Sequence, residues 1–172
     1  MALEIAVQRE ADWAGDTDWD ALAARAVEGA LRRTAQASLI TGPTSIEVSI
    51  RLTGDDEVRV LNAHYRGKDK PTNVLSFPMV QADLLETLAN TDDGEVLLGD
   101  IVLAAGVCRA EAAERGVSMA DHATHLIVHG TFHLLGYDHQ GDAEAETMES
   151  LERETMAALG LHDPYRIDED RG

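Results

Sequence analysis

The 172-residue chain is predicted to form an α+β fold, a single domain in which a mixed sheet of about four strands packs with about five helices. Segments with strand periodicity and segments with helical periodicity follow one another without the regular alternation of an α/β fold. The length, with 44% hydrophobic residues, suits one core, and no linker or internal repeat divides the chain. We therefore expect one domain over residues 1–165 and a charged tail over residues 166–172.

Four segments have the character of strands. Apolar residues alternate with polar ones in residues 3–7 and again in residues 46–51, which is typical of strands with one buried face. VLSFP, residues 74–78, ends in a proline that cannot donate to a ladder, so this short strand belongs at an edge or a strand end. GEVLLGDIVLA, residues 94–104, is the remaining predicted strand.

Helical periodicity covers residues 18–37, 55–66, 106–115, 118–135 and 142–159. Ser118 and Asp121 resemble a capping box at the start of the fourth of these helices, and Gly136 is placed to end it. Residues 81–94 are polar and turn-rich, which favours a surface excursion. The charged segment DPYRIDEDRG, residues 163–172, is expected to be loosely held.

Composition predicts a cytoplasmic protein. No segment approaches the about 20 consecutive apolar residues of a membrane-spanning helix. The start, MALEIAVQREADW, intersperses charges among its apolar residues and lacks the apolar core of a signal peptide. Cys108 is the only cysteine, so no intramolecular disulfide can form, and we expect it to be a small buried side chain. We predict neither a membrane partner nor a dinucleotide cofactor.

The formal net charge of -18 excludes general electrostatic binding to nucleic acid, because most of the surface repels phosphate. Twelve of the fourteen basic residues are arginines. The two lysines, Lys68 and Lys70, lie with Arg66 in one polar loop, RGKDK. Any contact with RNA is therefore expected to be local and to involve this loop. Without the histidine motif described next, an ordinary solvated loop would be the favoured interpretation.

Three histidines have the spacing of metal ligands. His129 and His133 are four residues apart, which places both imidazoles on one face of a helix. Gly136 can adopt a positive φ, so that His139 approaches the same point from outside the helix. Three imidazoles around a tetrahedral ion leave one position open, and such a site lowers the pKa of a bound water to about 7. We predict one catalytic zinc ion per chain at these three histidines.

The sequence leaves two possible roles open for each of three side chains near the predicted metal site. Asp138, next to His139, either orients an imidazole and helps to activate water, or is simply a turn residue. His122 and His125 lie about one to two turns before His129 on nearly the same helical stripe, too far to add a ligand. We expect them to line the cleft or to form hydrogen bonds in the core, and contact with a metal ligand is the alternative.

The histidine spacing resembles the zinc-binding segment of the metzincin proteases. Those enzymes place a glutamate directly after the first histidine as general base. Here that position is Gly130, which cannot transfer a proton. A metallopeptidase is therefore an alternative for which the spacing of the metal ligands is present but the general base is missing.

Two blocks together resemble the YbeY family, metal-dependent endoribonucleases of bacterial ribosomal-RNA maturation. The blocks are HGTFHLLGYDH, residues 129–139, and YRGKDKPTNVLSFP, residues 65–78. LLGDIVL, residues 97–103, is similar to the central strand of that family, and the resemblance covers residues 46–165. It implies that the three histidines bind zinc and that Arg66 is required for activity. It also implies action near the 3′ end of small-subunit ribosomal RNA and a part in ribosome quality control.

These residues suggest a mechanism of phosphodiester hydrolysis. The planar guanidinium of Arg66 can hold two phosphate oxygens beside the metal, and Lys68 and Lys70 can hold the flanking backbone. The candidate catalytic residues are therefore Arg66, His129 and Asp138. Attack by water and attack by the RNA 2′-hydroxyl both stay open. The acidic surface either restricts RNA to one cleft or contacts basic proteins of the small ribosomal subunit.

A non-catalytic, zinc-stabilised ribosome-assembly factor is the second alternative, besides the metallopeptidase. Closed structural zinc sites usually have four protein ligands rich in cysteine. The predicted site has three histidines and an open position, which favours a catalytic ion.

Overall fold

The computed structural model describes residues 3–13, 15–41, 45–81, 84, 95–137 and 141–165. Four strands form one sheet in the order β1-β2-β4-β3, namely β1 (Leu3–Arg9), β2 (Ser45–Thr53), β3 (Val74–Pro78) and β4 (Glu95–Ala104). The strands β1, β2 and β4 are parallel, whereas β3 pairs antiparallel with β4 at the edge. The predicted mixed sheet of an α+β fold is confirmed, with VLSFP at its edge.

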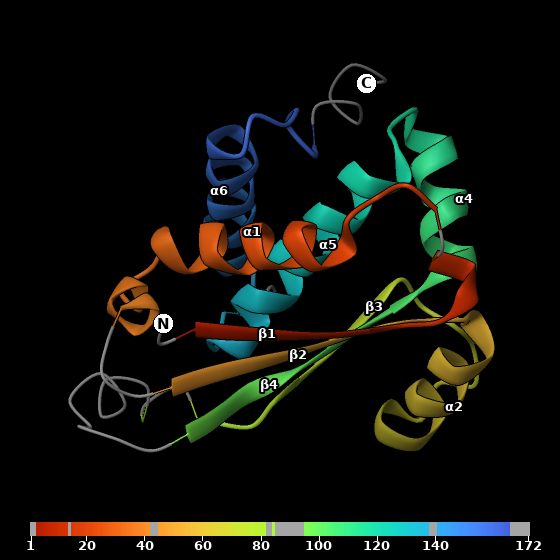
Figure 1. The fold of residues 1–172 in the computed structure, drawn as a ribbon, viewed down its shortest axis with the longest axis horizontal. Coiled ribbons are helices and arrows are strands. Elements are labelled where there is room, and N and C mark those ends of the chain that lie inside the picture. Colours follow the sequence, from red (N-terminus) through yellow and green to blue (C-terminus); the bar gives the residue numbers. More distant parts are fainter. Residues whose placement is uncertain are drawn as a thin grey trace.

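Helices lie on both sides of this sheet (Figure 1). They are α1 (Trp19–Arg32), α2 (Asp55–Arg66), α4 (Ala105–Arg115), α5 (Met119–Leu134) and α6 (Asp142–Ala158), with short 3-10 helices η1 (Ala11–Trp13) and η2 (Ala37–Ile40). Helices α1 and α5 pack on one face of the sheet and α6 packs on both of them, whereas α2 lies on the other side (Figure 1). None of the described helices is long and apolar enough to cross a bilayer.

The sheet separates two apolar clusters. Alternate residues of β2 point into the larger cluster beneath α1 and α5, and four of them are fully buried: Ile46, Val48, Ile50 and Leu52. This strict alternation explains why the strand was predictable from periodicity. The smaller cluster joins Val58 of α2 to Leu75, Val102 and Ala104 on the opposite face. Cys108 is buried in the larger cluster, as predicted.

The first predicted helix is too long. It ends at Arg32 instead of continuing to residue 37. Thr34 explains the early end, because its hydroxyl donates to the carbonyl of Leu31 (2.9 Å) and accepts from the amide of Gln36 (3.1 Å). Such local side-chain bonds compete with the helical ladder. The chain then turns into η2.

The cap at the start of α5 and the glycines that end α2 and α5 are as predicted. The Ser118 hydroxyl accepts from the amide of Asp121 (3.0 Å) at the start of α5. Gly67, after α2, and Gly136, after α5, have φ values of 69° and 96°. These left-handed conformations turn the chain sharply after each helix. Apart from residues 81 and 84, the predicted excursion over 81–94 lies outside the described residues, and so does the tail over 166–172.

Close packing at Gly99 of β4 predicts a large loss of stability when a side chain is added. A Cβ atom there would lie 2.6 Å from the carbonyl oxygen of Phe77 and would also overlap Leu134 of α5. We expect Gly99→Ala to lower the free energy of unfolding by about 2 kcal/mol or more, because the β3 backbone cannot yield without breaking its pairing. The measurement is urea denaturation followed by circular dichroism.

Gly141→Ala is the control for this prediction. A Cβ atom at Gly141 would meet no atom of the described residues within 4 Å. Its stability should therefore change by less than about 1 kcal/mol, the cost of a weaker helix cap. A Gly99→Ala protein as stable as the Gly141→Ala protein would contradict the close packing of β4 against α5 and β3.

Candidate active site

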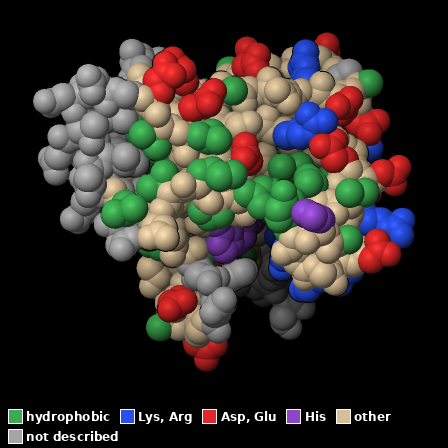
Figure 2. Space-filling view, turned by 90° about the horizontal axis from the view of Figure 1, so that it is seen from below, with side chains coloured by type: hydrophobic (Ala, Val, Ile, Leu, Met, Phe, Trp, Pro, Cys, Tyr) green, Lys and Arg blue, Asp and Glu red, His purple; other side chains and the backbone are tan. Residues whose placement is uncertain are grey.

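Helix α5 carries His129 and His133 into a cavity of about 770 Å³ at the β3 edge of the sheet. The end of α2 and the strand β3 form the other walls. The described lining residues are Tyr65, Arg66, Thr72, Asn73, Val74, Leu75, Ser76, Phe77, His129 and His133. Figure 2 views the molecule from below and shows histidine side chains in a hollow beside a patch of hydrophobic side chains. Both conspicuous sequence blocks therefore meet at one cavity.

The two helix histidines point their Nε2 atoms at each other. These atoms are 3.1 Å apart, and the ring centroids are 4.6 Å apart with an interplanar angle of 81°. Two imidazoles on one tetrahedral zinc ion, with Zn–N bonds of about 2.0 to 2.1 Å, place their nitrogens about 3.4 Å apart. The separation of His129 and His133 therefore fits ligands of a common ion with only a small adjustment.

The third predicted ligand, His139, and the neighbouring Asp138 lie outside the described residues. Within the described ranges, no group of three or more His, Cys, Asp or Glu side chains is arranged to hold a metal ion. The structure thus brings together His129 and His133, and the places of His139 and Asp138 stay a prediction.

A buried carboxylate lies behind His129. Glu152 of α6 is 1% exposed, and its Oε2 atom is 3.2 Å from Nδ1 of His129. Its Oε1 atom is 2.6 Å from Nε2 of His125 and accepts from the hydroxyl of Tyr165 at 2.9 Å. Burial by itself raises the pKa of the Glu152 carboxyl, but the hydrogen bonds to His125 and His129 outweigh it and hold the pKa at about 2. The group is therefore an anion in the folded protein.

His122 belongs to a second hydrogen-bond network, in which it is the buried member and its partners are half-buried. Its Nε2 atom is 2.8 Å from Oε1 of Glu111 in α4, which also accepts from the side-chain amide of Asn73 at 3.0 Å. Asn73 in turn accepts from the amide of Val74, the first residue of β3 (2.7 Å). The hydrogen bond to His122 lowers the pKa of Glu111. This network anchors the start of the strand that forms one wall of the cavity.

The structure resolves the alternatives for the two earlier histidines. His122 and His125 are both buried and both bonded to carboxylates, so they do not line the cavity formed by the described residues. His122 is a hydrogen-bonding core residue. His125 is one as well, and Glu152, which it contacts, also contacts His129.

Arg66 reaches the cavity because α2 ends there. The amides of Gly67 and Lys68 return to the carbonyls of Ala63 (3.1 Å) and Asn62 (3.3 Å), which closes the helix directly after Arg66. The described lining of the cavity includes Arg66 but neither Lys68 nor Lys70, which are exposed in the following loop. Of the three predicted phosphate-binding side chains, only Arg66 therefore shares the cavity with the histidines.

The loop after Arg66 is held by polar contacts. Arg59 of α2 makes two hydrogen bonds to Asp69, at 2.8 and 3.2 Å. The side-chain amide of Asn62, fully buried, donates to the carbonyl of Lys70 (2.8 Å). These contacts fix the backbone of the loop while leaving the two lysine side chains in solvent.

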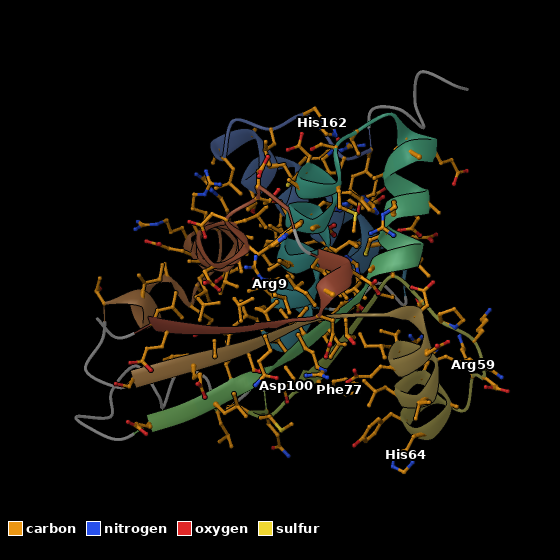
Figure 3. The ribbon with its side chains drawn as sticks, turned by 45° about the vertical axis from the view of Figure 1, so that its right-hand side comes forward. Arg9, Arg59, His64, Phe77, Asp100 and His162 are labelled. Carbon is orange, nitrogen blue, oxygen red and sulfur yellow. The ribbon has the colours of Figure 1, made fainter. Side chains whose placement is uncertain are left out.

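Two aromatic side chains of the cavity were missed from the sequence. The ring of Tyr65 is 62% exposed and packs on the ring of Phe77, with centroids 5.0 Å apart. Figure 3 shows Phe77 beside Asp100 on the side of the sheet where α2 and its His64 lie. Both rings stand in the block YRGKDKPTNVLSFP. The helical spacing of Tyr65 with Val58 and Leu61 predicts a buried side chain, and that prediction is wrong, because Tyr65 lies at the open end of α2.

Gly130 packs against the sheet. A Cβ atom at this position would lie 3.0 Å from Cγ2 of Ile101 in β4. The residue after His129 therefore faces the core, and a glutamate there would require the Ile101 side chain to shift. This packing gives a structural reason for the absence of the metzincin base.

The sequence profile of the endoribonuclease YbeY family matches residues 9–160, which is most of the chain. The chain belongs to the endoribonuclease YbeY family. A protein of this name from Rhizorhabdus wittichii is 66% identical over 168 residues, covering 98% of this chain and 99% of the relative. An endoribonuclease YbeY from Sphingopyxis alaskensis is 55% identical, with the same coverage of both chains. The predicted family is thus confirmed, and its enzyme class is the predicted one, an endoribonuclease.

A solved structure supports the fold of this YbeY family member. The solution structure of TM1509 from Thermotoga maritima is similar over 91% of this chain and 92% of its own, with a TM-score of 0.53 and 21% sequence identity. At that identity the likeness concerns the fold alone.

Proposed function

We propose that this member of the endoribonuclease YbeY family hydrolyses RNA phosphodiester bonds with one zinc ion, in maturation near the 3′ end of small-subunit ribosomal RNA and in ribosome quality control. One observation supports the proposal that the protein binds a metal ion. The Nε2 atoms of His129 and His133 face each other 3.1 Å apart at the cavity that Arg66 also lines. A metal and a guanidinium can thus act on the same phosphate.

His129, His133 and His139 would hold the ion as neutral imidazoles. Bound there, zinc supplies a Lewis acid that polarises a phosphoryl oxygen and makes water more acidic. Side chains of the protein bind the phosphate and transfer the proton. Arg66 binds the non-bridging oxygens of the phosphate and stabilises the charge that develops on them in the transition state. Asp138, adjacent to His139 in the sequence, is the proposed proton acceptor.

The cavity offers contacts to the nucleotide as well as to its phosphate. The exposed ring of Tyr65 and the ring of Phe77 provide faces on which a base can stack. Lys68 and Lys70, exposed in the segment after Arg66, would attract the flanking backbone as point charges. RNA binding at this site is therefore local, as the net charge of -18 requires.

We further propose proteins of the small ribosomal subunit as partners and the cytoplasm as the location, where ribosomal RNA is processed. The acidic surface supports this proposal, because ribosomal proteins are basic and opposite charge favours their encounter with the enzyme.

The decisive experiment compares polymers. Zinc-loaded protein and a His129→Ala control are incubated with structured small-subunit ribosomal RNA and with casein. We expect the unmutated protein alone to cut RNA and neither protein to cut casein. Cleavage of casein by the unmutated protein alone would indicate a metallopeptidase. A zinc-loaded protein that cuts neither polymer would indicate an assembly factor.

The ends of the RNA products identify the nucleophile. A 2′,3′-cyclic phosphate indicates attack by the 2′-hydroxyl, and products that never carry it indicate attack by water. Asp138→Asn tests the proposed proton acceptor in the same assay.

A further inference from the structure

We propose that Glu152 is a positioning residue of the metal site, and that His125 and Tyr165 hold this carboxylate in the orientation that fixes the imidazole of His129. The inference rests on the proposed zinc site. It assigns a role to three side chains outside the cavity lining, and it connects the C-terminal segment of the described chain to that site.

The buried position of Glu152 requires an explanation. Helix α6 buries Met148, Glu152, Thr155 and Met156 at helical spacing, so Glu152 occupies a place where an apolar residue is expected. A carboxylate without partners would be costly there. Its cost is offset because both oxygens are bonded to side chains from other segments, α5 and the chain after α6. These contacts therefore fix the orientation of the Glu152 carboxylate.

The two oxygens of Glu152 have different partners. Oε1 faces Nε2 of His125 at 2.6 Å and the Tyr165 hydroxyl at 2.9 Å, while Oε2 faces Nδ1 of His129 at 3.2 Å. A carboxylate oxygen accepts from a protonated ring nitrogen, so the contact between Oε2 and Nδ1 favours the tautomer of His129 that carries its proton on Nδ1. The lone pair of the neutral ring then lies on Nε2, the atom that faces His133. Glu152 thereby selects the tautomer and the ring orientation that a metal requires.

Tyr165 is itself held in place. Pro164 before it is buried, and its carbonyl accepts from the Arg115 guanidinium of α4 (3.0 Å). The ring of Tyr165 stands edge-on to His125, with centroids 5.6 Å apart, and the guanidinium of Arg153 lies 5.4 Å from its centre. The docked segment thus holds the Tyr165 hydroxyl against Oε1 of Glu152, the same oxygen that His125 of α5 contacts.

Glu152→Gln tests the inference with almost no change of shape. The amide keeps one acceptor and turns the other oxygen into a donor, so it cannot accept from His125, Tyr165 and His129 in the present pattern. We expect zinc affinity to fall about 10- to 100-fold, the usual effect of losing a residue that orients a ligand. Affinity is measured by competition with a chromophoric chelator, and the absorption spectrum of the cobalt-substituted protein reports the ligand geometry.

Glu154→Gln is the matched control, because Glu154 is an exposed carboxylate of the same helix. It should leave zinc affinity and the cobalt spectrum unchanged. Tyr165→Phe removes only the hydroxyl and should weaken zinc binding by about threefold to tenfold, below the effect of Glu152→Gln. If Glu152→Gln does not fold, the zinc affinity of Tyr165→Phe tests the inference instead.

The outcomes separate this inference from the proposed function. If the unmutated protein binds no zinc, the metal site and the inference both fail. If the unmutated protein binds zinc and the folded Glu152→Gln protein binds it equally well, the positioning role alone is wrong. Unchanged affinity in Tyr165→Phe likewise overturns the role of the C-terminal segment.

Discussion

His133→Ala is expected to lose zinc and RNA cleavage together. The substitution removes one of the two imidazole nitrogens that face each other at 3.1 Å, so the ion keeps too few ligands on α5. Metal catalysis contributes several kcal/mol to the stabilisation of the transition state, so the rate of RNA cleavage should fall about a thousandfold or more. Metal content is measured by elemental analysis after dialysis, and cleavage is measured on structured ribosomal RNA.

His162→Ala is the control, because His162 is exposed and lies outside the described lining of the cavity. It should retain about one zinc per chain and normal cleavage. Full metal retention in His133→Ala would remove this residue from the ligand set, whatever happens to the activity.

Arg66→Ala is expected to keep the metal and lose most of the cleavage. Arg66 lines the cavity with the histidines and stands at the end of α2, where the turn at Gly67 fixes its backbone. A donor that stabilises developing charge in the transition state is typically worth about 100- to 1000-fold in rate, so kcat should fall by that factor. Zinc content should equal that of the unmutated protein.

Arg66→Lys distinguishes charge from geometry. Lysine supplies a point charge without the planar fork, so the variant should recover only part of the lost rate. Arg32→Ala, which changes an exposed arginine of α1, should leave cleavage unchanged. Cleavage by Arg66→Ala at the unmutated rate would show that Arg66 does not take part in the reaction.

The elements of the fold were predictable wherever periodicity was strict. The alternation in β2 and the glycines after α2 and α5 gave the correct strand and the correct helix ends. The end of α1 was wrong because side-chain bonds of Thr34 interrupt an otherwise helical pattern. The tail prediction was also wrong for residues 163–165. Pro164 is buried and Tyr165 is bonded to Glu152, contacts that depend on tertiary structure.

The candidate site was predictable in part. Local spacing along one helix is enough to place His129 and His133 on a common face. Glu152 lies on another helix, so no spacing rule connects it to His129. Its signal was weaker, a glutamate on the buried face of an amphipathic helix. Lys68 and Lys70 follow Arg66 closely in the sequence, but Arg66 is the last residue of α2 and the turn at Gly67 leaves the lysines outside the described lining.

The packing of Gly130 also has an evolutionary consequence. The histidine spacing is common to this family and the metzincin proteases, which makes a change of substrate look like a matter of one residue. Gly130→Glu would instead force a long side chain against Ile101, since even a Cβ atom would be 3.0 Å from that residue. The Cβ atom alone would require Ile101, a buried core residue, to shift by a few tenths of an ångström, and the rest of the glutamate would have to be fitted against the same side chain. Acquiring the peptidase base therefore requires repacking around Ile101 in addition to the substitution itself.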